Sequence, residues 1–165
     1  MIKFNRYITH NRLLELLVCD PETGIMKWKI GRPGPTRGVG SVAGVQMKSG
    51  YWRICLDGHR YRRHNLVWFY VHGKWPKQIL DHRDRNPGND AIGNLREANM
   101  AQNQYNNGRK GKSGLKGVGL RGSRWCARIT VDKKTMHLGL FDTKELAHQA
   151  YKSAAKKFFG DFACA

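Results

Sequence analysis

Residues 78–106 read QILDHRDRNPGNDAIGNLREANMAQNQYN, and this stretch decides the fold. Its apolar beginning predicts a short strand that ends in the polar pair Asp81-His82. Residues 83–93 are rich in asparagine, aspartate, glycine and proline, which is typical of a loop. Residues 95–106 are compatible with a helix. The stretch therefore predicts a strand, a loop and a helix, with two chemically capable side chains at the end of the strand.

Asp81, His82 and Asn103, which lies on the expected helix, suit phosphodiester hydrolysis. This reaction needs an activated water and a cation on the phosphate. His82 can accept a proton at neutral pH because an unperturbed histidine has a pKa of about 6.5. Mg²⁺ prefers few protein oxygens, completed by water and phosphate oxygens. The carboxylate of Asp81 and the amide oxygen of Asn103 would supply such a set.

The chain before this stretch is organised by glycine-marked turns. Residues 51–62 predict a hairpin around Asp57-Gly58, the dipeptide that favours the tightest hairpin turns. Residues 64–72 are apolar and aromatic and predict a helix that ends at Gly73. Earlier still we expect an amphipathic helix over residues 8–18, a turn over 20–24 and a strand over 25–30.

After the helix-compatible segment the sequence changes character. Residues 108–114 predict a flexible basic linker. The alternation over residues 124–131 predicts a strand, and a turn at Lys133-Lys134 leads to a further strand. The expected faces are Trp125, Ala127, Ile129 and Val131 on one side, Arg124, Cys126, Arg128 and Thr130 on the other, with Met136, Leu138 and Leu140 facing inward from the last strand.

A helix is expected to complete this second region. Asp142 is the expected N-cap, with Glu145 three positions on as in a capping box. Gly160 is the expected stop. The apolar stripe comprises Ala147, Ala150, Tyr151, Ala154 and Phe158. The whole chain is therefore expected to be α+β, built in modules.

The charge of the chain is strongly positive. Thirty Lys and Arg against 12 Asp and Glu give +18 over 165 residues. Residues 1–80 carry +10, residues 81–112 only +2, and residues 113–165 carry +6. A polyanion such as nucleic acid relieves this self-repulsion. Carboxylates in the nearly neutral middle make sense beside phosphate only if a cation lies between them.

Other compositional signals exclude several classes. The four cysteines, Cys19, Cys55, Cys126 and Cys164, show no zinc-finger spacing, so we expect no structural zinc. No apolar run approaches the roughly 20 residues of a membrane span, and no secretory signal is visible. We expect a soluble cytoplasmic protein, in the host cell if a phage encodes it, with no membrane association and no evident protein partner.

The segment from about Tyr51 to residue 107 resembles the HNH endonuclease motif, in the variant with asparagine at the last position. The residues that carry the resemblance are Gly50-Tyr51, Asp57-Gly58, His64 to Trp68, Gly73, Pro76, Asp81-His82, Asn94-Leu95-Arg96 and Gln102-Asn103. The resemblance implies His82 as general base, Asp81 and Asn103 as ligands of Mg²⁺ or Mn²⁺, and Asn94 as a loop-ordering residue. It also implies a two-stranded ribbon plus helix around one divalent ion. The segment Asp20 to Gly24 with Trp28 looks like the leader of phage-type members.

The sequence departs from the motif in two places. The family usually has Asp-Asn late in the loop, where this chain has Asn89-Asp90, and Asn65 stands where Arg commonly follows His64. We expect neither departure to touch the proposed base or ligands. Simpler roles stay open: a turn pair for Asp81-His82, a turn residue for Asn94, a solvated helix residue for Asn103 and a packed residue for His64.

Residues 113–165 resemble an AP2 domain, a three-stranded sheet that enters the major groove with a helix behind it. The residues that carry this resemblance are Gly117-Val118, Trp125 to Ile129, Leu138 to Thr143, and Ala147, Ala150, Tyr151, Ala154 and Ala155. The expected DNA contacts are Arg121, Arg124, Arg128, His137, Lys133 and Lys134, and arginine is the commonest reader of guanine edges. Gly119 and His137 replace residues of the plant members, so base preference does not transfer. A sheet used only for general phosphate contact is the alternative.

The sequence thus predicts a nuclease region over residues 1–107 with its motif core at 51–107, a linker at 108–114 and an AP2-like domain at 115–165. The expected function is metal-dependent cleavage or nicking of double-stranded DNA, as in free-standing homing endonucleases of phages. One rival is a DNA-binding protein of the same fold that has lost catalysis. The other is a basic RNA-binding protein, although the chain lacks RNP-type aromatic motifs.

Overall fold

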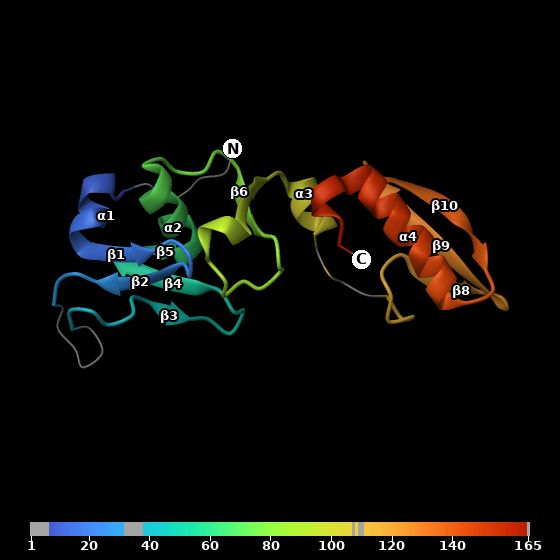
Figure 1. Ribbon diagram of the computed structural model, residues 1–165, viewed down its shortest axis with the longest axis horizontal. Helices are drawn as coiled ribbons and strands as arrows, with labels where there is room; N and C mark the ends of the chain where they lie inside the picture. Colours follow the sequence, from blue (N-terminus) through green and yellow to red (C-terminus); the bar gives the residue numbers. More distant parts are fainter. Residues whose placement is uncertain (1–6, 32–37, 107, 109–110, 165) are drawn as a thin grey trace. The chain divides into compact units, whose positions relative to one another are not determined.

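The computed structural model describes residues 7–31, 38–106, 108 and 111–164, and Figure 1 shows the order of their elements. The chain divides into two compact units, Met1–Ala98 and Asn99–Ala165. Both units combine helices with antiparallel sheets, so the expected mixture of α and β elements is confirmed. The functional division near residue 107 stays a prediction.

The first unit begins with helix α1 (His10–Leu16), which runs directly into strand β1 (Leu17–Asp20). Thr9 caps the helix through its side chain, which accepts a hydrogen bond from the Arg12 amide. The helix is shorter than the expected 8–18 because β1 pairs with β2 (Ile25–Trp28) over its full length. Burial then alternates along β1, so that Leu17 and Cys19 lie in the core. The expected turn over residues 20–24 joins these two strands.

The second sheet of this unit contains β3 (Val45–Gln46), β4 (Trp52–Leu56) and β5 (His59–Arg62), in that order. Asp57 and Gly58 form the tight turn between β4 and β5 with φ angles of 45° and 79°, as a type I′ hairpin requires. Helix α2 (Arg63–His72) follows at once and ends at Gly73, which is left-handed with a φ of 66°. The expected hairpin and the expected helix are both confirmed.

A two-stranded ribbon ends the first unit. Strand β6 (Ile79–His82) pairs antiparallel with β7 (Leu95–Ala98), and a short 3-10 turn, η1 (Ile92–Asn94), leads into β7. The expectation of a helix from Leu95 was wrong for its first four residues. They are extended because pairing with β6 buries Leu95 and Ala98.

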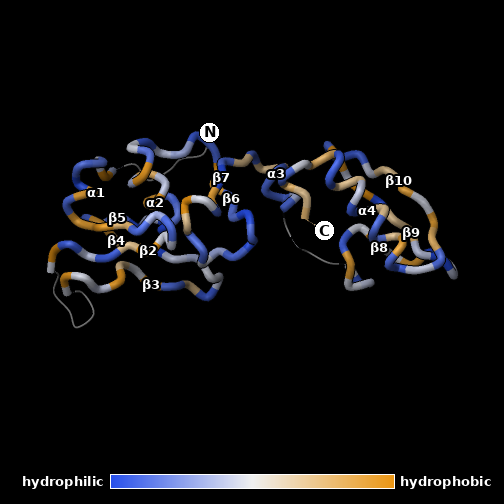
Figure 2. Tube along the Cα trace, viewed as in Figure 1, coloured by the Kyte–Doolittle hydropathy of each residue, from blue (hydrophilic) through white to orange (hydrophobic). Residues whose placement is uncertain are grey.

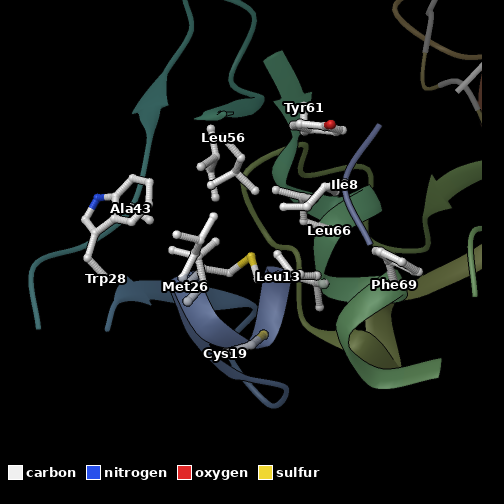
Figure 3. Packing of buried hydrophobic residues seen from close by; sticks show 14 of the residues in the cluster. Ile8, Leu13, Cys19, Met26, Trp28, Ala43, Leu56, Tyr61, Leu66 and Phe69 are labelled. Atoms are coloured by element: carbon white, nitrogen blue, oxygen red, sulfur yellow. The ribbon is translucent and has the colours of Figure 1, made fainter. Parts of the chain in front are cut away.

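The core of the first unit lies between α1, α2 and the two β-hairpins that precede α2. Figure 3 shows Leu13, Met26, Leu56 and Leu66 pointing toward one another from these elements. In Figure 2 the tube of these segments carries stretches of apolar (orange) colour. This packing holds the β6 end of the ribbon against the rest of the unit through Leu80 and Leu95, which belong to the same cluster.

The second unit begins with helix α3 (Met100–Tyr105), capped by Asn99 and Gln102 in a reciprocal capping box. Strands β8 (Val118–Arg121), β9 (Arg124–Val131) and β10 (Lys134–Phe141) form one antiparallel sheet in the order β10-β9-β8. Helix α4 (Lys144–Phe159) lies along one face of this sheet and ends in the 3-10 turn η2 (Gly160–Phe162) (Figure 1). Three strands followed by one helix agree with the expectation.

Two details of the sheet differ from the expectation. The turn between β9 and β10 uses Asp132 and Lys133, both with positive φ, while Lys134 already belongs to β10. The pairing of β10 with β9 is irregular between His137 and Gly139. Such a bulge reverses the side-chain alternation beyond it. Leu140 is therefore exposed, and Phe141 packs toward the core instead.

The helix also differs at both ends from the expectation. Thr143, not Asp142, is the N-cap, since its hydroxyl accepts the Leu146 amide, so Glu145 is not at the capping-box position. At the other end Phe159 is buried and Phe158 is exposed. The buried row runs Ala147, Tyr151, Ala155 and Phe159, a strict four-residue spacing. Within the described ranges no helix is long and apolar enough to cross a membrane.

Candidate functional site

The candidate active site lies where β6 ends and its loop begins. Asp81 and His82 are the last two residues of β6, and both side chains are buried. Both also lie in polar surroundings, because each is bonded to a partner from another element. Each is therefore a buried polar residue with a partner of its own, Arg96 for Asp81 and Asp90 for His82.

His82 is held by the carboxylate of Asp90. The distance from His82 Nε2 to Asp90 Oδ1 is 2.9 Å. An ionised carboxylate can only accept, so the bond places the ring proton on Nε2 and the lone pair on Nδ1. This is the tautomer in which Nδ1 is the basic nitrogen.

Asp90 is itself fixed by helix α2. Arg63 Nε donates to Asp90 Oδ2 at 2.7 Å, and the same guanidinium donates to the Gly88 carbonyl at 2.9 Å. Asp90 is completely buried and Arg63 is 3% exposed. Burying a carboxylate is costly unless it is paired, so Arg63 stabilises Asp90 in the position where it accepts the hydrogen bond from His82 Nε2–H.

This contact corrects the expectation that the Asn89-Asp90 departure leaves the proposed base untouched. Asp90 is the direct partner of His82, and sequence reasoning missed it as a site residue. The departure itself was the available signal, because it places a carboxylate where the family motif has an amide. What the sequence did not reveal is that the loop folds this residue back onto β6.

Asp81 forms a second buried ion pair. Arg96 on β7 is its cross-strand partner, and Arg96 Nε and Nη2 lie 2.9 and 2.8 Å from Asp81 Oδ2. Both contacts involve the same carboxylate oxygen.

Asn94 ties together the loop between β6 and β7. Its amide nitrogen donates to Asp84 Oδ1 and to the Asn89 carbonyl, and its Oδ1 accepts from the Asp84 amide. Burial raises the pKa of Asp84, but hydrogen bonds from Asn86, Asn89 and Asn94 outweigh it, so the net pKa lies below its usual value. These bonds are what a loop-ordering residue would make, and that role stays a prediction.

Asn103 lies on α3 in the second unit, and its side chain is exposed. The helix that carries it follows β7 after one capping residue, so the order of strand, loop, strand and helix expected of the motif is present in the chain. The joint cation site of Asp81 and Asn103 stays a prediction.

His64 is a further residue of the cluster. Its Nδ1 is buried without a hydrogen-bond partner among the described residues and lies 4.0 Å from Asp90 Oδ1. Burial lowers the pKa of His64 to about 4, although Asp90 opposes the shift. His64 is therefore neutral at physiological pH. One ligand atom each from His64, His82 and Asp90 lies within 4.8 Å of the others.

The second unit presents a basic sheet face on the side away from α4. By register Arg121 faces Arg124 across β8 and β9, and Arg128 faces His137 across β9 and β10. All four side chains are exposed. Arg121 and Arg124 are like charges directly opposite one another, an arrangement that destabilises a sheet, and Arg124 is also paired with Asp142 at 3.3 Å.

The two predicted lysines are not part of that cluster. Lys133 lies in the β9–β10 turn. Lys134 faces Val131, on the opposite side of the sheet from Arg128. The structure therefore groups four of the six predicted DNA contacts on one face, which we call the basic sheet face (Arg121, Arg124, Arg128 and His137).

Comparisons with known proteins identify the family of the segment that holds this site. Residues 61–105 match the HNH endonuclease family. Protein 3.8 of Escherichia phage T7 is 35% identical over 107 residues, which cover 62% of this chain and 88% of the phage protein. A solved structure titled "DNA binding and cleavage by the HNH homing endonuclease I-HmuI" is 19% identical, with a TM-score of 0.42 and 87% of this chain and 85% of that chain covered. The chain therefore belongs to the same family as Protein 3.8 of phage T7, and its residues 61–105 make up an HNH endonuclease domain.

Proposed function

We propose that the chain is a metal-dependent endonuclease that hydrolyses phosphodiester bonds of double-stranded DNA, nicking or cleaving it at preferred sites. The observation that carries the proposal is the buried chain of contacts from Arg63 through Asp90 to His82, inside the segment that matches the HNH family. A histidine oriented by a carboxylate is the arrangement that general bases use to accept a proton and to stabilise the resulting imidazolium.

In the proposed reaction His82 Nδ1 accepts a proton from water while the water oxygen attacks phosphorus. Asp90 holds the ring through Nε2–H and stabilises the positive charge that the ring acquires. The bond from phosphorus to the leaving oxygen breaks, and that oxygen takes a proton from the surrounding water. A base positioned in this way contributes typically 10²–10⁴-fold to the rate.

The residues present fit a hard divalent cation such as Mg²⁺, with Mn²⁺ as a substitute. The donors would be the carboxylate of Asp81 and the amide oxygen of Asn103, both of the oxygen type that Mg²⁺ prefers. When bound, the ion would stabilise charge on the phosphate and on the leaving oxygen.

Target preference is assigned in this proposal to the basic sheet face of the second unit, read as AP2-like. Three arginines and a histidine on one exposed face could contact both the phosphates that border a DNA groove and the guanine edges within it. The net charge of +18 adds a sequence-independent attraction that falls with salt.

A catalytically inactive DNA-binding protein is the second candidate. The observation in its favour is that Asp81 and Asp90 are both neutralised by buried arginines. A supercoiled-plasmid assay separates the two candidates. We expect nicked or linear DNA with Mg²⁺ or Mn²⁺, none with EDTA, and a higher metal requirement or no activity for Asp81→Ala.

If the chain binds the plasmid but does not cleave it at any Mg²⁺ or Mn²⁺ concentration, the endonuclease proposal is wrong and the chain is a catalytically inactive DNA-binding protein. Cleavage that persists in a chelated, nuclease-free preparation would contradict the metal requirement.

A further inference from the structure

Three ligand-type side chains converge in the interior of the first unit from different elements: His64 from α2, His82 from β6 and Asp90 from the loop. We propose that they form a binding site for a divalent transition-metal ion of the zinc, cobalt and nickel class, and that an ion bound there inhibits the nuclease by occupying His82. The binding part stands on the geometry alone, and the inhibitory part rests on the proposed function.

The donor set selects the class of ion. Two imidazole nitrogens and one carboxylate oxygen suit zinc and its neighbours, whereas Mg²⁺ prefers oxygen alone. Three protein ligands with a fourth position for water are a common zinc arrangement. The site would therefore bind a different ion from the one expected at Asp81 and Asn103.

The distances are close to those of a bound ion. Two donors of a tetrahedral zinc ion lie roughly 3.4 Å apart. His82 Nε2 and His64 Nδ1 lie 2.9 and 4.0 Å from the same oxygen, Asp90 Oδ1. The His64 and His82 rings are perpendicular, with centroids 5.2 Å apart. Movements on the order of 1 Å would bring the three donors around one ion.

His64 gives the site an available ligand. Its Nδ1 is buried, has no hydrogen-bond partner among the described residues and is oriented toward Asp90. An unsatisfied buried nitrogen is unusual in a folded protein. A metal ion would satisfy this nitrogen.

The surroundings would hold the ligands in place. Arg63 binds Asp90 through Oδ2, the oxygen that does not contact His82. Ligating carboxylates are usually hydrogen-bonded in this way by a neighbouring group. The ring of Tyr51 packs edge-on against both histidine rings. An ion would thus bind donors that are already oriented by Arg63 and by the packing of Tyr51.

Occupancy would reverse the tautomer of His82. Without an ion the proton is on Nε2 and the lone pair is on Nδ1. An ion bound at Nε2 needs the lone pair there, so the proton must reside on Nδ1. A ring in that state cannot accept a proton from water, and the general base is disabled.

Calorimetric titration of the full chain with Zn²⁺ and with Ni²⁺ tests the binding part. We expect His64→Gln to weaken one binding event by at least about 10–100-fold. The controls are His72→Gln, which removes an exposed histidine of the same helix, and Cys55→Ser, which removes an exposed thiol. Both should leave that event unchanged. Equal affinity and stoichiometry for wild type and His64→Gln would overturn the site.

A measurement on the wild-type chain keeps the proposal testable even if a variant fails to fold. In a ¹⁵N-histidine spectrum, Co²⁺ should shift the His64 and His82 rings together, ahead of the other five histidines. Shifts confined to other histidines would contradict the site.

The inhibitory part is tested in the plasmid assay with Mg²⁺ in excess. Added Zn²⁺ should reduce cleavage by the wild type far more than by His64→Gln, with each compared to its own zinc-free rate. Equal inhibition of both would overturn this part while leaving the calorimetric result standing. A chain that never cleaves DNA would remove the proposed function and with it the inhibition, but not the binding.

Discussion

At the scale of single residues, the environment of His82 is set by two arginine–carboxylate pairs. Arg63 with Asp90 and Arg96 with Asp81 are both buried, and the histidine contacts the first of these carboxylates directly. Buried pairs of this kind contribute little net stability compared with apolar packing, yet they are costly to break. Two such pairs close to one histidine fit a site whose ligand is charged.

Replacing the proposed base should separate catalysis from binding. His82→Ala should lower the cleavage rate by about 10²–10⁴-fold, because no other group would take the proton from water. Affinity for DNA should change little, since His82 is buried and outside the basic sheet face. Cleavage kinetics on plasmid and a gel-shift titration measure the two properties. A mutant as active as the parent would refute the assignment.

Breaking the Arg63 pair should cost stability. Arg63→Met leaves the fully buried Asp90 without its cation, a loss of about 3–5 kcal/mol. Urea denaturation of the first unit, followed by tryptophan fluorescence, measures it. The control is Arg12→Met, which removes an arginine from an exposed pair with Asp57 and Glu15 and should change stability little. Similar losses in both variants would contradict the role given to burial.

At the scale of elements, the β1–β2 turn supports the loop that holds Asp90. Gly24 has a φ of 67°, and a Cβ there would collide with the backbone of Asp90 and Ala91. Pro21 in the same turn accepts a hydrogen bond from the Ile92 amide at 2.8 Å. The β1–β2 turn therefore sets the position of Asp90 in the loop of the candidate site.

Gly24→Ala should impair activity without touching any site side chain. The methyl group must displace the Asp90 backbone, and a misplacement of about 1 Å can lower a rate about 10²-fold. Gly58→Ala is the matched control, since Gly58 also has a positive φ but nothing lies within 4 Å of the position that its added methyl group would take. Both variants carry backbone strain, and only the first should lose cleavage beyond its loss of stability. Parallel losses would show that strain alone is responsible.

At the scale of the whole molecule, charge and chemistry are divided along the chain. The segment with the candidate site carries +2, and the flanking segments carry +10 and +6. The exposed arginines of the second unit lie on a sheet face that no helix among the described residues covers. We expect affinity and site choice to reside there and bond cleavage to reside in the first unit with α3.

A truncated chain of residues 1–107 should keep cleavage chemistry but lose affinity and site preference. In the full chain, Arg121→Ala, Arg124→Ala or Arg128→Ala should each cost about 1–3 kcal/mol on the preferred site if the arginine reads a base. A contact to phosphate alone would weaken all sequences alike and reduce the salt slope by about one. Binding to specific and random duplexes across salt concentrations distinguishes these results. Unchanged affinity and selectivity of the truncated chain would move targeting to the N-terminal basic region.

The sequence by itself determined the features that local backbone preference controls. Asp57-Gly58 predicted its hairpin because few residues accept positive φ at both turn positions. Gly73 predicted the end of α2 for the same reason. The alternation over β9 predicted its faces, since burial on one side imposes a period of two. The position of Asp81-His82 at a strand end followed from the same local signals.

Features that depend on contacts between residues distant in sequence were decided only by the tertiary structure. Leu95 to Ala98 are extended because β6 pairs with them, against a pattern that a helix also satisfies. Leu140 and Phe141 exchange faces because of a bulge at Gly139, a glycine with positive φ inside the strand, whose effect on the faces sequence reasoning did not predict. Asp90 joins the site because burying its carboxylate requires both Arg63, 27 residues earlier, and His82. Backbone dihedral preferences depend on residues adjacent in sequence. A buried charge instead needs a partner, and which residue becomes that partner depends on the tertiary fold.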